Sequence, residues 1–265
     1  MAQQSKPASK GNVISLRSGD AVGGQLPLLA LQVNTSMSSD LGTADLERIV
    51  GCNDSHFYAL KSMEVHSLLP ATEYLCYKIA GACEVPTPMG AIVLTPPHQI
   101  PAFGSRWEGG LTELTARGAV SVLELYRECS GVLSATLALD LFLGNDDRHM
   151  KNFLFRKTHG ERFAAIAIDY SRAFLVKGFP FDQFPQSANT RTNATINLHK
   201  RGETWNGPFA VHALGRVLDI STAHLEHWIN EIPKEWLSRS DAAKLLHWWG
   251  SDAKNERFNR TLQML

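Results

Sequence analysis

The sequence lacks several features that would assign the protein to a specialised class. Lysine and arginine together number 26, as do aspartate and glutamate, so the formal net charge is zero. Without an excess of positive charge there is no reason to expect binding to nucleic acid or to an anionic membrane surface. The 4 cysteines form no CxxC pair and the 10 histidines show no metal-ligand spacing, which argues against a zinc site and a disulfide framework.

Long hydrophobic runs are also missing near the N-terminus. The longest early apolar run, residues 26–33, is too short to span a bilayer, and no apolar segment of a leader peptide follows the polar first residues. We therefore expect a cytoplasmic protein with free thiols and a disordered tail over residues 1–11. With 44% hydrophobic residues, a chain of 265 residues is long enough for a sizeable core.

The most informative segment present is LGNDDRHMKN, residues 143–152. Asp147 precedes Asn152 by five positions, and Asp169 follows at the end of the apolar run AAIAID. Phosphoryl transfer needs a carboxylate to orient the attacking hydroxyl and oxygen ligands to hold Mg²⁺ on the nucleotide phosphates. An Asp, an Asn and a later Asp in this order supply those groups, so the segment indicates a kinase-type site.

The flanking pattern predicts how these residues meet. Residues 131–144 are almost continuously apolar and end in Gly144, which is typical of a buried helix with a C-terminal glycine. The apolar runs 153–155 and 163–168 flank a turn and predict a β-hairpin. Asp140, inside the apolar helix, would be costly if unpaired, so we expect it to pair with Arg148, Arg172 or backbone donors.

The run GNDDRHMKN followed by IDYSRAF resembles the HipA-like kinases and, more distantly, the phosphatidylinositol 3/4-kinases. The resemblance implies that Asp147 is the catalytic aspartate, His149 the loop histidine, and Asn152 and Asp169 the Mg²⁺ ligands. It extends over residues 48–229. Tyr58-Ala59-Leu60-Lys61 is similar to the strand that carries the ATP lysine, Glu73 would pair with that lysine, and residues 78–88 resemble the turn after the glutamate's helix.

The resemblance also implies a hairpin over the nucleotide phosphates and a connector against the adenine. The turn-forming residues 51–55 contain Gly51 and Ser55, and a phosphorylated Ser55 would repel the nucleotide through its added negative charge. In the connector predicted over residues 103–110, Ser105 and Trp107 are the candidate adenine contacts. The alternative for Ser55 is an ordinary turn serine, and for Trp107 a buried packing role.

Other candidates have ordinary alternatives too. Lys61 is also interpretable as a solvated strand residue, and Glu73 as a residue favoured near a helix start by the helix dipole. Asp146 and Asp147 would suit a turn after a helix, His149 a hydrogen-bonding loop residue, and Asp169 a strand-end cap. Their occurrence together in kinase order favours the functional interpretation, and the spacing to Asn152 favours Asp147 over Asp146.

The predicted fold class is α+β, a protein-kinase-like two-lobed fold with a small β-rich N-terminal lobe (12–108) and a mostly helical C-terminal lobe (109–265). Strands are expected at 12–16, 26–33, 47–50, 56–61 and 91–94, and helices at 70–80, 120–129, 131–144, 209–218, 221–232 and 241–265. Residues 36–42 are interpreted as loop. Residues 177–203, rich in Asn, Thr, Gln, Pro and Gly, predict a long loop over a substrate cleft.

The expected function is an ATP- and Mg²⁺-dependent kinase. A Ser or Thr of a protein as acceptor, a toxin-type role and an antitoxin-type regulator are implied by the resemblance to HipA-like kinases. Two alternatives stay open from the sequence. One is a small-molecule or phosphoinositide-type kinase with the same Asp and Asn logic, and the other is a non-catalytic nucleotide-binding module. Neither a nucleic-acid partner nor a membrane partner is expected.

Overall fold

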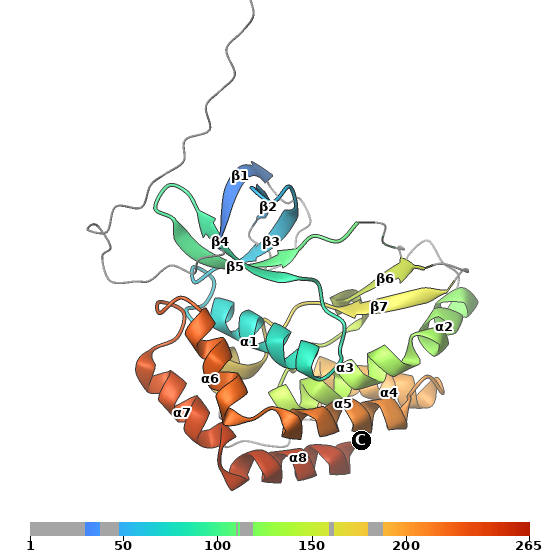
Figure 1. Cartoon of the computed structure of the whole chain (residues 1–265). Helices are drawn as coiled ribbons and strands as arrows, with labels where there is room; N and C mark the ends of the chain where they lie inside the picture. The colour runs from blue at the N-terminus through green and yellow to red at the C-terminus, as the bar shows by residue number, and fades with distance from the viewer. Residues whose placement is uncertain (1–29, 38–47, 110, 112–118, 159–161, 180–187) are drawn as a thin grey trace, which may run out of the picture.

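A computed structural model describes residues 30–37, 48–109, 111, 119–158, 162–179 and 188–265. These residues form a β-rich N-terminal part above a mainly helical C-terminal part (Figure 1). The α+β class predicted from the sequence is therefore confirmed. The predicted strand over residues 12–16 and the predicted N-terminal tail lie outside the described residues.

The N-terminal part is a small closed barrel of five strands in the order β1-β2-β3-β5-β4. The strands are β1 (Leu31–Met37), β2 (Ile49–Cys52), β3 (Phe57–Lys61), β4 (Gly90–Thr95) and β5 (Ile100–Arg106). Neighbouring strands are antiparallel except for β1 and β4, whose parallel pairing closes the barrel. Because closure pairs every strand on both sides, the barrel has no open edge.

Two strand predictions need correction. The strand predicted over residues 26–33 continues to Met37, because Ser36 and Met37, predicted as loop, pair with Val50 and Ile49 of β2. Residues 103–106, predicted as part of a connector, belong to strand β5 and pair with β3. Gly104 of β5 leaves room for the side chain of Val93 in β4, since a Cβ there would lie 2.6 Å from Val93 Cγ2.

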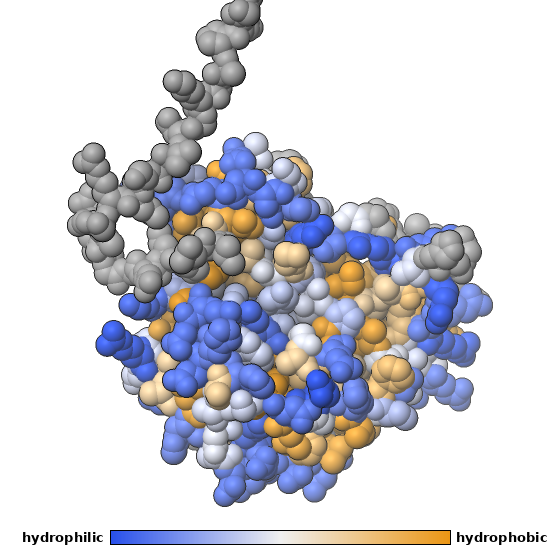
Figure 2. Space-filling view, viewed as in Figure 1, coloured by the Kyte–Doolittle hydropathy of each residue, from blue (hydrophilic) through white to orange (hydrophobic). Residues whose placement is uncertain are grey.

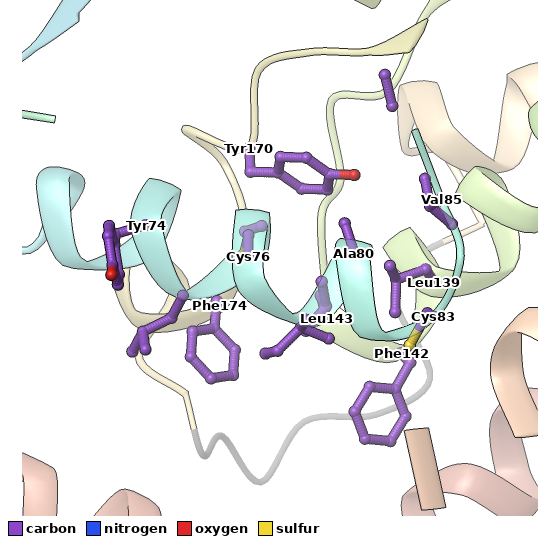
Figure 3. Packing of buried hydrophobic residues seen from close by; sticks show 14 of the residues in the cluster. Tyr74, Cys76, Ala80, Cys83, Val85, Leu139, Phe142, Leu143, Tyr170 and Phe174 are labelled. Carbon is purple, nitrogen blue, oxygen red and sulfur yellow. The ribbon is translucent and has the colours of Figure 1, made fainter. Parts of the chain in front are cut away.

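Helix α1 (Leu69–Ala82) packs beneath the barrel and confirms the helix predicted over residues 70–80. Pro70 lies in its first turn, where the missing N–H costs nothing. Figure 3 shows Tyr74, Cys76 and Ala80 of α1, and Cys83 directly after it, among buried side chains from the helical part and from the chain after Asp169. A single core therefore fixes α1 against the C-terminal part.

The C-terminal part begins with helices α2 (Ala119–Glu128) and α3 (Ser130–Leu143), followed by the hairpin β6 (Phe153–Lys157) and β7 (Phe163–Ala167). Gly144 ends α3 in the left-handed conformation, with φ 73°. Glycine adopts this conformation at little cost because it has no Cβ. The strands β6 and β7 pair antiparallel. The buried helix, its glycine and the hairpin predicted from the sequence are all confirmed.

Further helices complete this part: α4 (Arg191–Arg201), α5 (Gly207–Asp219), α6 (Thr222–Glu231), α7 (Arg239–Trp249) and α8 (Asp252–Met264). The prediction of a long loop over residues 177–203 is wrong for residues 191–201, which form α4. Residues 180–187 lie outside the described residues. The helix predicted over residues 241–265 is two helices, because the chain turns at Gly250 and restarts α8 from Ser251.

The C-terminal helices hold the barrel and α1 directly. Trp236, between α6 and α7, is fully buried and donates its indole N–H to the carbonyl oxygen of Pro101 in β5 at 3.1 Å. Glu231 at the end of α6 accepts hydrogen bonds from Tyr74 and Lys78 of α1, both at 2.8 Å. These contacts fix the position of α1 relative to both parts.

The face seen in Figure 2 is mainly hydrophilic, with apolar patches between the charged side chains. All four cysteines are buried and free, as the sequence indicated. Among the described residues, no helix is both long and apolar enough to cross a membrane.

We expect Trp236→Phe to lower the free energy of unfolding by about 1–3 kcal/mol, because it removes a buried hydrogen bond and leaves a gap in the core. Urea titration followed by circular dichroism measures this loss. Trp107→Phe is the matched control, since Trp107 is 42% exposed, and it should change stability by less than about 0.5 kcal/mol. Equal effects of the two substitutions would contradict the anchoring role of Trp236.

Candidate functional site

Lys61, Glu73 and Asp169 meet where the barrel faces the helical part. The amine nitrogen of Lys61 lies 3.3 Å from Asp169 Oδ1 and 3.8 Å from Glu73 Oε1. Lys61 is the last residue of β3, Glu73 lies near the start of α1, and Asp169 follows β7. The structure therefore brings together a predicted ATP lysine, its predicted glutamate and a predicted metal ligand, although Lys61 and Asp169 are 108 positions apart.

The position of α1 makes this meeting possible. The backbone N–H of Tyr170 donates to Glu73 Oε1 at 3.1 Å, so the residue after Asp169 is fastened to α1. Tyr170 and Phe174 pack against the same helix (Figure 3). The alternative that Lys61 is a solvated strand residue is wrong, because Lys61 is buried with an exposed fraction of 7%.

Burial and mutual charge set the ionisation of the two carboxyl groups. Burial raises the pKa of Glu73 to about 7, and Lys61 only partly opposes the shift. Burial also acts on Asp169, but the charge of Lys61 and the hydrogen bonds from Ser171 prevail and lower the pKa of Asp169 to about 2. Asp169 is thus a fixed anion at neutral pH, whereas Glu73 titrates near pH 7.

Asp169 has an unusual backbone conformation. Its φ is 63°, in the left-handed region, which Asp tolerates better than most residues because its short side chain bonds locally. Here Asp169 Oδ1 accepts the N–H of Ser171 at 3.1 Å. Such residues concentrate at functional sites, where the surrounding packing maintains the strain.

The loop with Asp147 and Asn152 is built on a buried ion pair. Arg148 and Asp140 both have an exposed fraction of 0%. The guanidinium of Arg148 binds the carboxylate of Asp140 in a bidentate manner, with its Nε 2.6 Å from Oδ2 and its Nη2 3.1 Å from Oδ1. Asn145 donates to Asp140 Oδ1 at 2.8 Å. Of the partners predicted for Asp140, the structure selects Arg148.

Arg148 also joins the loop to the strand that precedes Asp169. Its Nη1 donates to the carbonyl oxygen of Asn152 at 3.0 Å and to that of Ile168. The N–H of Ile168 in turn donates to the carbonyl oxygen of Asn152 at 3.1 Å. Although burial disfavours its charge, Asp140 raises the pKa of Arg148 above its ordinary value. A permanently charged guanidinium therefore sets the spacing between Asn152 and Asp169.

Asp146 and Asp147 diverge in their contacts. Asp146 pairs with Lys177, whereas Asp147 Oδ1 lies 2.9 Å from the Nη1 of Arg191 at the start of α4. The side-chain amide of Asn152 donates to the carbonyl oxygen of Asp147 at 3.2 Å. The five-residue spacing thus corresponds to a closed loop, in which Asn152 braces the backbone of Asp147.

His149 lies half-buried in the same loop, and its backbone oxygen accepts the N–H of Asn152 at 2.9 Å. Burial lowers the pKa of His149 below its ordinary value, so its imidazole is mainly neutral at neutral pH. The backbone contact gives His149 a structural part in the loop, and a catalytic role for its ring stays a prediction.

The donor set at this site suits Mg²⁺. The nitrogen of the Asn152 amide is occupied by the Asp147 carbonyl, which leaves its oxygen for a cation. The ionised carboxylate of Asp169 supplies the negative charge. No group of three His, Cys, Asp or Glu side chains with metal-binding geometry occurs among the described residues. Mg²⁺ is commonly held by one or two side chains plus substrate phosphates, so the two residues fit this mode.

Gly51 and Ser55 are not brought to the site. Gly51 pairs with Phe57 at the beginning of β3, and Ser55 is in the turn that joins β2 to β3. Lys61 is at the other end of β3, about 13 Å from Phe57 at the usual rise per residue of a strand. The geometry therefore does not support these two residues as phosphate contacts. Met37 at the end of β1 and Ile49 at the start of β2 lie at the Lys61 end of the barrel, and residues 38–47 between them lie outside the described residues.

Ser105 and Trp107 occupy the passage from the barrel to the helical part. Ser105 lies in β5 opposite Ala59, and Trp107 directly follows β5 and donates its N–H to the carbonyl oxygen of Phe57 at 2.7 Å. Since Trp107 is 42% exposed, the interpretation as a buried packing residue is wrong. Next to it, Glu108 forms an ion pair with Arg156 of β6, which joins the two parts.

Several residues that build the site were given no role from the sequence. Thr192 Oγ1 donates to the carbonyl oxygen of Asn145 at 2.5 Å and accepts the N–H of Arg148 at 3.0 Å. Thr195 donates to the carbonyl oxygen of Arg148 at 2.9 Å. Only Arg148 carried a signal in the sequence, as a cation eight positions after the buried Asp140. Thr192, Thr195 and Arg191 meet the loop through tertiary packing alone.

No protein-family model matches the sequence, and neither does any curated protein. Among solved structures, the Helicobacter pylori proinflammatory kinase CtkA is similar, with a TM-score of 0.57 and 15% sequence identity over 91% of this chain and 99% of that chain. HipA of the Shewanella oneidensis MR-1 toxin–antitoxin system, solved with HipB and its operator DNA, has a TM-score of 0.49 and 12% identity over 91% of this chain and 66% of that chain.

The likeness to CtkA shows that the chain has the fold of a known kinase. At the level of the fold, this agrees with the kinase-type site that the catalytic-loop motifs indicated. The predicted strand lysine, helix glutamate and later aspartate meet within this fold.

Asp140→Leu should lower the free energy of unfolding by about 3–5 kcal/mol, because it leaves the buried guanidinium of Arg148 without its counter-ion. The double variant Asp140→Leu/Arg148→Met should recover part of this loss, since no unpaired charge then remains. Chemical denaturation of the three proteins gives the comparison. A double variant less stable than Asp140→Leu would contradict the view that the uncompensated charge causes the loss.

Proposed function

We propose that the protein is a kinase that transfers the γ-phosphoryl group of ATP to a hydroxyl, with Mg²⁺ as cofactor. The observation that carries this proposal is the contact of Lys61 with both Glu73 and Asp169, beside the loop that presents Asp147 and Asn152. These are the parts that phosphoryl transfer needs, namely a cation for the nucleotide phosphates, metal ligands and a hydroxyl-orienting carboxylate.

Each residue has a defined part in the proposed reaction. Lys61, held by Glu73, contacts the α- and β-phosphates. Asn152 and Asp169 would hold Mg²⁺, which neutralises the charge of the phosphates when bound. The oxygen of the acceptor hydroxyl forms a bond to the γ-phosphorus, the bond between that phosphorus and the bridging oxygen breaks, and ADP leaves. Asp147 orients the hydroxyl and takes its proton.

The two parts of the structure would be the lobes of this kinase. We keep the boundary predicted from the sequence, with residues 12–108 in the N-terminal lobe and residues 109–265 in the C-terminal lobe. The ion pair between Glu108 and Arg156 supports the division, because it lies where the chain leaves the barrel and reaches the hairpin of the helical part. Adenine would lie between the lobes, beside Ser105 and Trp107.

The acceptor and partners follow from the resemblance to HipA-like kinases. We infer a Ser or Thr of a protein as acceptor and an antitoxin-type regulator. A cytoplasmic location is inferred from the free thiols. The absence of a nucleic-acid partner stays a prediction from the zero net charge. A screen of protein, aminoglycoside and phosphoinositide acceptors with radiolabelled ATP distinguishes a protein kinase from a small-molecule or lipid-headgroup kinase.

Asp147→Asn and Asp169→Asn should each reduce phosphoryl transfer by at least about 100-fold, because one removes the proton-accepting carboxylate and the other a charged metal ligand. Transfer of ³²P from ATP to acceptors, or hydrolysis of ATP, measures the loss. Asp146→Asn is the matched control, since Asp146 faces Lys177 instead, and it should retain activity. An inactive Asp146→Asn protein beside an active Asp147→Asn protein would reverse the assignment.

Binding of Mg·ATP should strengthen as the pH rises from 6 to 8. The pKa of Glu73 is raised to about 7, so Glu73 gains the charge that positions Lys61 only as the pH passes that value. Asp169, with its pKa of about 2, stays ionised over the whole range. In isothermal calorimetry, Glu73→Gln should bind Mg·ATP more weakly and with less pH dependence, because it lacks the titrating carboxyl group. The titration of ATP itself is the same for both proteins and cancels in the comparison. Parallel pH profiles would exclude Glu73 as the titrating group.

A further inference from the structure

Arg191, for which the sequence predicts no role, contacts the proposed catalytic carboxylate. Its Nη1 lies 2.9 Å from Asp147 Oδ1. The side chain of Arg191 is 67% exposed and that of Asp147 is 34% exposed, so the pair lies at the open side of the loop. Because an exposed ion pair contributes little to stability, we look for the function of Arg191 at the site and not in folding.

The position of Arg191 is fixed by the first turn of α4. Thr190 caps this helix by accepting the N–H of Asn193 at 3.1 Å. Thr192 and Thr195 then bind the backbone of Asn145 and Arg148 on the Asp147 loop. The helix start and the loop thus form one hydrogen-bonded unit, and Arg191 is directed to Asp147 by buried contacts rather than by its own exposed ion pair.

Three other cations around the loop, Lys61, Arg148 and Lys177, are committed to other partners. Every guanidinium nitrogen of Arg148 is bound to Asp140 or to a backbone carbonyl. Lys61 is held by Glu73 and Asp169, and Lys177 by Asp146. Arg191 contacts Asp147 through one end of a planar fork that has five N–H donors. Among the described residues, it is the exposed guanidinium at the catalytic carboxylate.

We propose that Arg191 is a further catalytic residue, which binds the phosphoryl group during its transfer. This inference rests on the proposed function. In a reactive complex the acceptor oxygen lies between Asp147 and the γ-phosphorus, and reacting atoms approach to about 3–3.5 Å. A guanidinium against Asp147 is therefore within side-chain reach of the phosphoryl oxygens. Its fork matches their geometry and stabilises the charge on them while the γ-phosphorus passes from ADP to the acceptor.

The proposal separates transition-state binding from nucleotide binding. Mg·ADP with fluoroaluminate mimics the phosphoryl group in transfer, and this probe needs no knowledge of the acceptor. Arg191→Met should weaken binding of this probe by about 100-fold, whereas binding of Mg·ADP alone should change by less than about threefold. Hydrolysis of ATP, with water as acceptor, should slow by a similar factor. Arg191→Lys should recover part of both losses, because it keeps the charge without the fork.

Arg201→Met is the matched control, since Arg201 is an exposed arginine in the last turn of the same helix, and it should leave binding unchanged. Thermal unfolding of each variant shows whether α4 stays folded. If Arg191→Met weakens binding of Mg·ADP alone as much as binding of Mg·ADP with fluoroaluminate, Arg191 has only a structural role. If hydrolysis of ATP is unchanged or faster, Arg191 only blocks access to Asp147. Both results overturn the inference. Wild-type protein that binds no Mg·ATP would instead refute the proposed function.

Discussion

The candidate site depends above all on the buried ion pair of Asp140 and Arg148. Removing two charges from water is expensive, and the cost is offset only when good geometry and further hydrogen bonds satisfy both groups. Here the pair is bidentate, Asn145 donates to the carboxylate, and the remaining guanidinium nitrogen binds the carbonyl oxygens of Asn152 and Ile168. The same contacts that compensate the buried charges therefore join the Asp147 loop to the strand that ends at Asp169.

A second set of charges, Lys61 with Glu73 and Asp169, spans the boundary between the barrel and the helical part. One amine faces two carboxyl groups in a region of low dielectric, and the two respond differently. Asp169 stays ionised because Lys61 and Ser171 stabilise its charge, whereas burial dominates for Glu73. This asymmetry provides one permanent anion for a metal and one carboxyl group whose charge depends on conditions near neutrality.

The C-terminal helices act as the frame for these two charge clusters. Helix α4 fixes the loop through Thr192 and Thr195, while Glu231 and Trp236 fasten α1 and the barrel. Helix α1 lies between these supports: its Glu73 contacts Lys61 and Tyr170, and its apolar side chains join the core of Figure 3. The positions of the reactive groups are thus set by packing far from the groups themselves, which is the usual condition for a preorganised site.

The sequence by itself determined the features that depend on neighbouring residues. The apolar run before Gly144, the hairpin of β6 and β7, helix α1 and the order of Lys61, Glu73, Asp147, Asn152 and Asp169 were all predictable, because periodicity, caps and short spacings are local.

The tertiary structure alone decided the rest. Strand β5 contains Pro101 and Gly104 and resembles a loop until it pairs with β3, and α4 is rich in polar residues that become helical against the Asp147 loop. Gly51 and Ser55 looked suitable as turn residues, but the antiparallel register places them at the wrong end of β3. Arg191 meets Asp147 across 44 positions, and no local pattern encodes a contact made by two elements that pack only after the chain has folded.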